Sequence, residues 1–315
     1  YYCLECVITF DKRATPFPTI DTNALVFMIK KAKPNKNFVW VKTLEPREDE
    51  LLTLVKSDFK HIGFSHLEIS ERDLAEGLQT GLSRPKQLES MSKYQLKDFA
   101  KVMRGIATGA NEFFFLTNEQ AKDFGIPKDY LKLAIGRTRD VVNGVLTRKD
   151  IQELQTKGRP TNLLSVNGHE HFPKSVQKYL AKGEELKLPE RALIKQRKPW
   201  YKMEERKMPP LLFAYLGRRN SRFIKNEVGA LPLTGFLCVY PLSEDTEHIH
   251  NLWQALNHPD TLENLKLVGK SYGSGAIKAE PRSLEKLAIP EHVVEAFGLT
   301  KQDKNFQTGL FEDAA

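Results

Sequence analysis

The sequence predicts an α+β fold, in which a sheet-rich N-terminal segment precedes an irregular mixed α/β domain. Short apolar runs of strand length dominate residues 1–57, and a polar stretch with repeated serine and glycine follows at 58–92. From Lys93 onward, short apolar runs alternate with loops. We therefore expect a connector at 58–92, a main domain at 93–295 and a C-terminal tail at 296–315.

The first strand is predicted at Leu4–Phe10, which is rich in β-prone residues. Two further runs, Asn23–Lys31 (NALVFMIKK) and Phe38–Leu44 (FVWVKTL), flank the turn-forming residues Pro34 to Asn37. Two β-prone runs joined by a short turn predict a β-hairpin.

A short helix is predicted at Arg47–Ser57, because its start is acidic and Leu51, Leu52 and Val55 share one face. The connector is expected to hold some helix around Glu71–Gly77. The main domain has strand candidates at Phe113–Leu116, Leu131–Ile135, Leu211–Leu216, Phe223–Ile224 and Gly235–Tyr240. Its helix candidates are Asn118–Phe124, Lys174–Lys182, His248–Leu256 and Ser283–Leu287.

Composition narrows the class of protein. The net charge of +8 is compatible with a polyanionic partner, and the three cysteines are too few for a disulfide framework, which points to a reducing cytosol. The longest apolar run, Ala24 to Ile29, has the length of a strand and is too short to span a bilayer. The chain starts at Tyr1 without an initiator methionine, so we expect it to be processed or a piece of a longer polypeptide.

The stretch KVMRGIATGANEFFFLT predicts a small-residue loop between two buried strands. Glycine permits positive φ and close backbone approach, so Gly105 and Gly109 suit a loop that touches a ligand. Thr108 and Asn111 offer hydrogen bonds to phosphates or base edges, and Arg104 adds positive charge. The phenylalanines are expected to anchor the loop with alternate rings pointing inward. A plain tight turn is the alternative interpretation.

Eleven cations and only two acidic residues lie between Arg191 and Lys225. The cations are interleaved with aromatic residues, among them Trp200 and Tyr201. Cations neutralise phosphates, arginine reads guanine edges, and aromatic rings stack on unpaired bases. A solvated basic face over core aromatics is the alternative. The density of charge and the three helix-breaking prolines in this segment favour nucleic-acid contact.

Five landmarks occur in a characteristic order: RGIATGANEFFFLT, LKLAIGRTRDV, KQRKPWYKMEERKMPPLLFAYLGRRNSRFIKN, LWQALN and GKSYGSGAIKAEPRSLEKLAIP. This order resembles the C-terminal half of the adenine-specific DNA methyltransferases of restriction–modification and related phage-defence systems. The resemblance covers residues 1 to 295. It implies the C-terminal strands of a Rossmann-like methyltransferase domain at 1–57. It also implies a target recognition domain, related to the specificity subunits of type I restriction enzymes, at 93–295.

The N-terminal segment TPFPTIDTNALVFMIKK resembles the Phe-Pro motif near the end of the catalytic domain in this family. The resemblance implies that Phe17, followed by Pro18, packs against the adenine that is flipped out of the duplex. An extruded base needs an apolar wall to replace its lost stacking. A core position for Phe17 is the alternative, and Phe10 is a competitor for the same role.

Two motifs of the family lie upstream of the Phe-Pro motif there and do not occur in this sequence: the glycine-bearing S-adenosylmethionine loop and the Asn/Asp-Pro-Pro-aromatic motif. The sequence Met208-Pro209-Pro210-Leu211 lacks both the polar residue and the aromatic residue. The glycines of YGSGAIK follow no clear strand and precede no long helix, as a nucleotide loop would require. We therefore expect a catalytically incomplete part of a base-flipping methyltransferase, whose S-adenosylmethionine binds elsewhere in the parent.

The resemblance implies that this part binds double-stranded DNA in a prokaryotic cytoplasm, beside a restriction or other defence-system subunit and without a membrane partner. Besides Phe17, the predicted DNA-binding residues are Arg104, Gly105, Thr108, Gly109, Asn111, Arg137, Arg139, Lys195, Arg197, Lys198, Trp200, Tyr201, Arg218, Arg219 and Arg222. Among these, the last three arginines are expected to clamp phosphates.

Two other functions remain open from the sequence. The first is a non-catalytic DNA-specificity subunit that works with a separate methylase, and the second is an RNA-binding protein. We predict no metal site, because Cys3 and Cys6 have only Cys238 as a further cysteine and would face opposite sides of a strand. The His-x-His pairs at His169 and His248 have no supporting ligand pattern.

Overall fold

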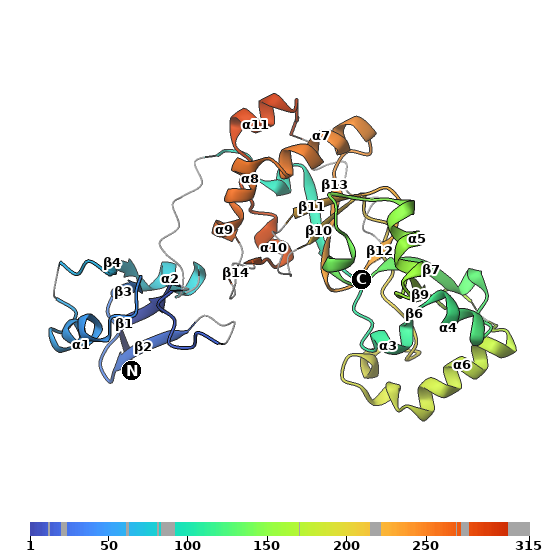
Figure 1. The fold of residues 1–315 in the computed structure, drawn as a ribbon, viewed down its shortest axis with the longest axis horizontal. Helices are drawn as coiled ribbons and strands as arrows, with labels where there is room; N and C mark the ends of the chain where they lie inside the picture. The colour runs from blue at the N-terminus through green and yellow to red at the C-terminus, as the bar shows by residue number, and fades with distance from the viewer. Residues whose placement is uncertain are drawn as a thin grey trace. The chain divides into compact units, whose positions relative to one another are not determined.

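The computed structural model describes residues 1–11, 13–19, 24–60, 63–80, 82, 92–169, 171–214, 222–268, 270–271 and 277–301. The chain forms two units. Unit 1 comprises Tyr1–Ser90 with Ser271–Ala276, and unit 2 comprises Met91–Lys270 with Ile277–Ala315. Figure 1 draws the chain of unit 1 in blue to cyan and that of unit 2 mainly in green to red.

Unit 1 is built on a four-stranded sheet with the order β2-β1-β3-β4. Strand β1 is antiparallel to β2 and parallel to β3, so the predicted hairpin is wrong, although both of its strands exist. Because β1 is apolar on both faces, it favours an interior place in the sheet, between the two expected hairpin partners. The strands are β1 Cys3–Phe10, β2 Leu25–Lys30, β3 Asn37–Thr43 and β4 Leu67–Asp73.

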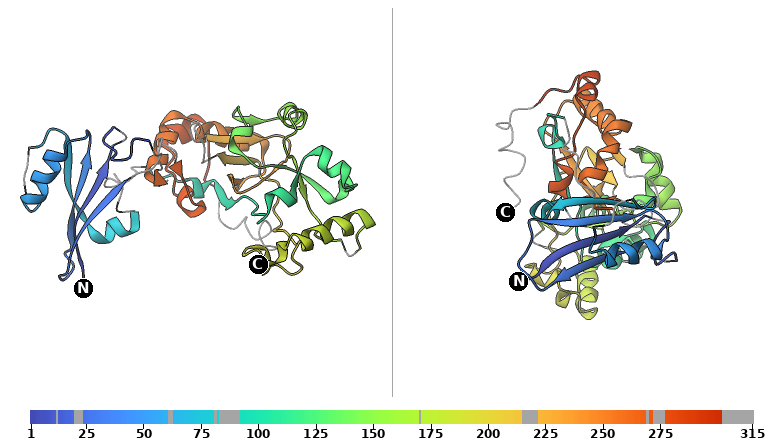
Figure 2. Two further views of the ribbon diagram at one scale, coloured as in Figure 1. Left: turned by 60° about the horizontal axis from the view of Figure 1, so that its bottom comes forward. Right: turned by 90° about the vertical axis from the view of Figure 1, so that its left-hand side faces the viewer.

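Two helices cover the two faces of this sheet, and Figure 2 shows them on opposite sides of the strands. Helix α1, Glu48–Lys56, packs Leu54 against one face, while Leu52 of the expected apolar face is exposed. Helix α2, Leu74–Thr80, lies on the other face, where Leu74 contacts the cluster of Val7, Phe38 and Trp40. Unit 1 is thus a helix–sheet–helix sandwich.

The segment expected as a connector, 58–92, supplies both β4 and α2. The polar sequence of β4, LEISERD, suits the edge of a sheet, where charged side chains reach water and discourage further pairing. The composition did not reveal these two elements, because edge strands and loops share a polar composition.

Unit 2 contains two larger sheets. The five-stranded sheet has the order β5-β13-β10-β11-β8, and the four-stranded sheet has the order β12-β7-β9-β6. A further, two-stranded sheet pairs β14 Lys270–Ser271 with β15 Ile277–Lys278. The strands are β5 Ala100–Arg104, β6 Phe115–Leu116, β7 Leu131–Ile135, β8 Val145–Leu146, β9 Asn162–Leu164, β10 Leu211–Ala214, β11 Arg222–Asn226, β12 Leu231–Pro232 and β13 Phe236–Pro241.

The helices of unit 2 pack on these sheets around three buried clusters. They are α3 Asn111–Phe114, α4 Asn118–Asp123, α5 Arg148–Thr156, α6 Lys174–Glu185, α7 Thr246–Leu256, α8 Pro259–Glu263, α9 Leu265–Val268, α10 Pro281–Leu284 and α11 Glu291–Ala296. Helices α4, α6, α7 and α10 overlap the predicted ones, whereas α5 was not predicted. No helix in the described part of the chain has both the length and the apolar character to cross a bilayer.

Candidate nucleic-acid interface

Residues 105–110 form the loop that joins β5 to α3. Gly105 has an ordinary φ, but a Cβ atom there would lie 2.2 Å from the carbonyl oxygen of Leu233. The close backbone approach expected at this glycine therefore serves packing against the segment after β12, where Ile106 also forms a bridge with Leu233. Gly109 does adopt positive φ, at 77°, which favours glycine.

Gly105→Ala is expected to lower the free energy of unfolding by about 2–4 kcal/mol, because the added methyl group meets backbone that cannot turn aside. Gly144→Ala is the control, since its Cβ would lie 3.4 Å from the Trp253 ring and cost under about 1 kcal/mol. Urea unfolding midpoints measure both. Equal losses would show that the contact with Leu233 does not constrain the loop.

The Thr108 side chain makes its hydrogen bonds within the chain segment that ends the loop. Thr108 is buried, and its hydroxyl donates to Asn111 Oδ1 while accepting from the Ala110 amide at 3.2 Å. Asn111 and Arg104 are exposed, and Arg104 forms an ion pair with Glu280. Among the predicted contacts of this loop, Thr108 is thus turned inward, and Asn111 and Arg104 reach the surface.

The three phenylalanines after the loop are all buried, which corrects the expectation that alternate rings point inward. Phe113 and Phe114 lie in the single turn of α3, so they do not alternate as strand residues would. Phe113 stacks on Tyr179 with ring centroids 4.5 Å apart, and the Tyr179 hydroxyl donates to the Phe113 carbonyl at 2.7 Å. The end of the loop is therefore fixed by aromatic side chains that pack in the core of unit 2.

Arg197, which lies in the cation-rich stretch between Arg191 and Lys225, holds this loop in place. Its guanidinium donates to the carbonyl oxygens of Ala107 at 2.5 Å and Thr108 at 2.9 Å. Burial lowers the pKa of Arg197, opposed by the nearby Glu204 carboxylate. This arginine was predicted to contact DNA, and in the structure its hydrogen bonds connect two protein segments.

Arg197→Ala is expected to lower the free energy of unfolding by about 1.5–3 kcal/mol, because the loop loses two charge-assisted hydrogen bonds. Lys195→Ala, at an exposed neighbour, is the control and is expected to change stability by less than about 0.5 kcal/mol. Thermal unfolding measures the difference. If Arg197→Ala unfolds like the wild type and changes only the salt dependence of DNA binding, Arg197 is a phosphate contact.

Trp200 and Tyr201 are half-buried and pack on the aromatic cluster beneath the loop. The Trp200 ring lies 5.9 Å from Phe113 between centroids, and its indole N–H donates to Glu184 at 3.3 Å. Their rings thus pack on the edge of this core while staying half-exposed, and base stacking by them stays a prediction. Lys195 and Lys198, on the same segment, are exposed.

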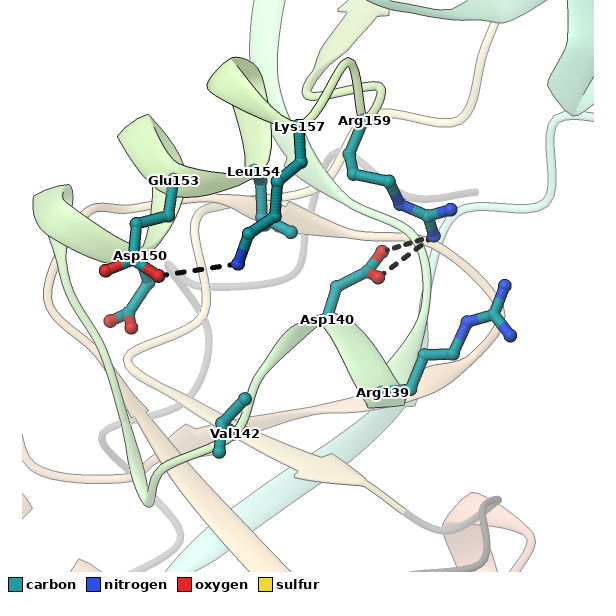
Figure 3. A pocket seen from close by; sticks show the side chains of 8 residues that line it. All are labelled: Arg139, Asp140, Val142, Asp150, Glu153, Leu154, Lys157 and Arg159. Atoms are coloured by element: carbon teal, nitrogen blue, oxygen red, sulfur yellow. Dashed lines mark hydrogen bonds and ion pairs between the residues drawn. The ribbon is translucent and has the colours of Figure 1, made fainter.

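The turn after β7 carries Arg137 and Arg139, both exposed. Arg159 fixes this turn, because its guanidinium donates to both carboxylate oxygens of Asp140 at 2.9 and 3.0 Å. Figure 3 shows this ion pair at the wall of a hollow of about 290 Å³, with Arg139 beside it. Sequence reasoning missed Arg159, which is 19 residues from its partner and follows an unpredicted helix.

Of the three predicted phosphate clamps, Arg218 and Arg219 lie outside the described residues. Arg222 is half-buried and donates to the Val141 carbonyl. It therefore ties β11 to the chain just after the Arg137–Asp140 turn.

The structure brings together segments that are far apart in the sequence. The Leu233 amide donates to the Ile135 carbonyl at 2.9 Å, so the same residue touches both Gly105 and the strand that leads into the Arg137–Asp140 turn. Arg197 joins the 195–201 segment to the other side of the loop. The loop at residues 105–110 therefore contacts the 195–201 segment through Arg197 and is linked through Leu233 to the strand that leads into the Arg137–Asp140 turn.

In unit 1, Phe17 is 50 % exposed, and its amide donates to Thr15 Oγ1 at 3.2 Å. Its competitor Phe10 ends β1 and packs on the buried cluster that includes Ile8. Phe17 is thus the accessible ring of the two. Thr22 and Asn23 of the same motif lie outside the described residues.

The Pro-Pro sequence has a structural role. The Asn226 side chain donates to the Pro209 carbonyl and the Asn226 amide donates to the Pro210 carbonyl, each at 2.8 Å. Both carbonyls are engaged within unit 2 at the start of β10. Gly273 and Gly275 of YGSGAIK lie outside the described residues.

The described residues contain one group of metal-ligand type, His258, Asp260 and His292, whose ligand atoms all lie within 4.8 Å. Asp260 Oδ2 is 2.9 Å from His292 Nε2, and this contact connects α8 to α11. The group lies far in sequence from Cys3 and Cys6, which are both buried in unit 1.

A family model for the C-terminal domain of the type II methyltransferase M.Eco57I matches residues 82–315. The type II methyltransferase M.AccI of Acinetobacter calcoaceticus is 33% identical over 190 residues, which is 60% of this chain and 35% of that protein. The crystal structure of the type IIG restriction endonuclease BpuSI aligns over 94% of this chain and 39% of that one, with 16% identity and a TM-score of 0.41. The chain thus spans about a third of the length of its curated relative.

Proposed function

Because the chain belongs to the family of the C-terminal domain of the type II methyltransferase M.Eco57I, we propose that it is the DNA-recognition part of an adenine-specific DNA methyltransferase. The parent enzyme transfers a methyl group from S-adenosylmethionine to the 6-amino group of an adenine that it flips out of the duplex. It acts in a restriction–modification or related phage-defence system, and unit 2 binds the double-stranded target. M.AccI, by its name a type II methyltransferase, supports this assignment.

One observation carries the DNA-binding part of the proposal, namely the contacts that link the loop at residues 105–110 to the 195–201 segment and to the strand before the Arg137–Asp140 turn. The exposed cations of these segments are Arg137, Arg139, Lys195 and Lys198. Cations held on fixed turns neutralise phosphates and set the register of a protein on DNA. Arg197 and Arg159 hold these turns through hydrogen bonds of their own, so the surface is organised before DNA arrives.

The Pro-Pro sequence of this chain does not fit the Asn/Asp-Pro-Pro-aromatic motif of such an enzyme, because the Pro209 and Pro210 carbonyls already accept hydrogen bonds from Asn226. The cofactor site is therefore assigned, within this proposal, to another part of the parent enzyme. Unit 1 contributes Phe17, whose half-exposed ring is available to an extruded base.

Mapping of methylated bases in a methylation-deficient host tests the function. With the parent gene present, N6-methyladenine is expected at one recurring duplex sequence and is absent without the gene. Methylated cytosine alone would contradict adenine specificity. Tighter binding of this chain to structured RNA than to duplex DNA would contradict DNA recognition and favour an RNA-binding protein.

A further inference from the structure

Three side chains that can bind a metal meet where α8 contacts α11 in unit 2. They are His258, Asp260 and His292, and one ligand atom from each lies within 4.8 Å of the others. Asp260 Oδ2 is 2.9 Å from His292 Nε2 and 3.9 Å from His258 Nδ1. The sequence did not indicate this group, because 32 residues separate Asp260 from His292.

The spacing of these atoms suits a tetrahedral zinc ion. Bonds of about 2.0–2.1 Å to nitrogen and oxygen place the ligand atoms of such an ion roughly 3.4 Å apart. The two contacts of Asp260 Oδ2 lie about 0.5 Å on either side of this spacing, so small rotations of the side chains complete the geometry. Two imidazoles and a carboxylate are a ligand set that zinc accepts, and they leave the fourth position to water.

Buried neighbours fix the backbone that carries the three ligands. Thr261 follows Asp260 in α8, Val293 follows His292 in α11, and both Thr261 and Val293 are fully buried. His258 is the N-cap residue of α8, where its Nδ1 accepts a hydrogen bond from the Asp260 amide at 3.3 Å. An accepting ring nitrogen carries the lone pair with which imidazole binds a metal, so this long hydrogen bond is exchanged for a bond to the ion.

We propose that His258, Asp260 and His292 bind one zinc ion, which clamps α8 to α11. The three side chains are 34%, 54% and 63% exposed, so an ion in solution reaches them without opening the fold. Val293 and Val294 of α11 pack in the largest buried cluster of unit 2, so the clamp holds this helix on the core whatever nucleic acid the unit binds.

Calorimetric titration of the whole chain with zinc chloride tests the site. One ion per chain is expected to bind, with a Kd of roughly 1–10 µM for three ligands in an open site. His292→Ala and Asp260→Ala are each expected to weaken binding at least about 100-fold, because even outer-shell partners of a metal site are worth about 10–100-fold. His171→Ala is the matched control, at an exposed histidine of the His-x-His pair, and is expected to bind as the wild type does.

The native thiols compete little for zinc, because all three are buried and burial raises the pKa of Cys6 to about 12 and that of Cys238 to about 11. Amide hydrogen exchange gives a second readout. Zinc is expected to slow exchange in α11 about tenfold in the wild type and to leave it unchanged in His292→Ala.

The absence of binding overturns the proposal, and so does binding that survives in both ligand variants. Equal losses in all three variants also overturn it, because zinc would then bind to surface histidines in general. Circular dichroism checks that each variant folds. If His292→Ala does not fold, the comparison of Asp260→Ala with His171→Ala decides.

Discussion

Alanine at Arg137, Arg139, Lys195 and Lys198 together is expected to weaken binding to duplex DNA by roughly 100-fold at 0.1 M salt. Each phosphate contact contributes about 0.9 to the slope of log affinity against log salt, so the slope is expected to fall by about 3 to 4. All four side chains are exposed, so the unfolding midpoint is expected to stay where it is. Fluorescence anisotropy over a salt series measures affinity and slope together.

A control with the same change in net charge separates position from total charge. It replaces four exposed lysines on the α4 to α6 part of unit 2, namely Lys122, Lys128, Lys174 and Lys178. Their loss is expected to reduce affinity by less than about threefold, because only the general attraction of a basic protein is lowered. If both quadruple variants lose affinity equally, the region around residues 105–111 is not a distinct DNA-binding surface.

Phe17→Ala in the parent methyltransferase is expected to reduce kcat/KM for methyl transfer by about 5- to 150-fold. An aromatic ring stacked on a base is worth about 1–3 kcal/mol, and each 1.4 kcal/mol corresponds to a factor of ten. The ring is half-exposed in unit 1, so its removal is expected to leave stability within about 0.5 kcal/mol. Methyl transfer from labelled S-adenosylmethionine to duplex DNA gives the rate.

Two companion variants separate base packing from folding. Phe17→Tyr keeps the ring and is expected to retain most of the rate. Phe10→Ala removes a ring that packs on the buried cluster of unit 1, so it is expected to cost about 1–3 kcal/mol of stability. A full rate in Phe17→Ala would mean that another residue packs against the flipped adenine.

Local sequence patterns predicted the elements better than their pairing. The strand at Leu131–Ile135 is found at the predicted residues, and α7 contains the predicted helix His248–Leu256, because periodicity and capping are local properties. The prediction of a hairpin between β2 and β3 was wrong, because nothing in the turn Pro34 to Asn37 shows that β1 lies between these two strands. Strand neighbours depend on burial across the whole sheet, which short stretches do not encode.

For the predicted DNA-contact residues, too, the sequence was informative about local features but not about contacts between distant segments. The sequence indicated which segments are basic, but it did not show that Arg197 bonds to the Ala107 and Thr108 carbonyls or that Trp200 packs on Phe113. Arginine and tryptophan can pack in a core, hydrogen-bond two segments of the protein together or contact DNA, and only their neighbours in space distinguish these roles. The link between the 105–110 loop and the 195–201 segment also depends on contacts that span about 90 residues.

Amide hydrogen exchange of this chain, with and without duplex DNA, tests most directly whether the surface around residues 105–111 binds DNA. The proposed function predicts that DNA slows exchange in the 104–111 loop, the 137–141 turn and the 195–201 segment together, while unit 1 strands β3 and β4 exchange as before. Protection confined to other parts of unit 2, with these three segments unchanged, would contradict the proposed DNA-binding surface.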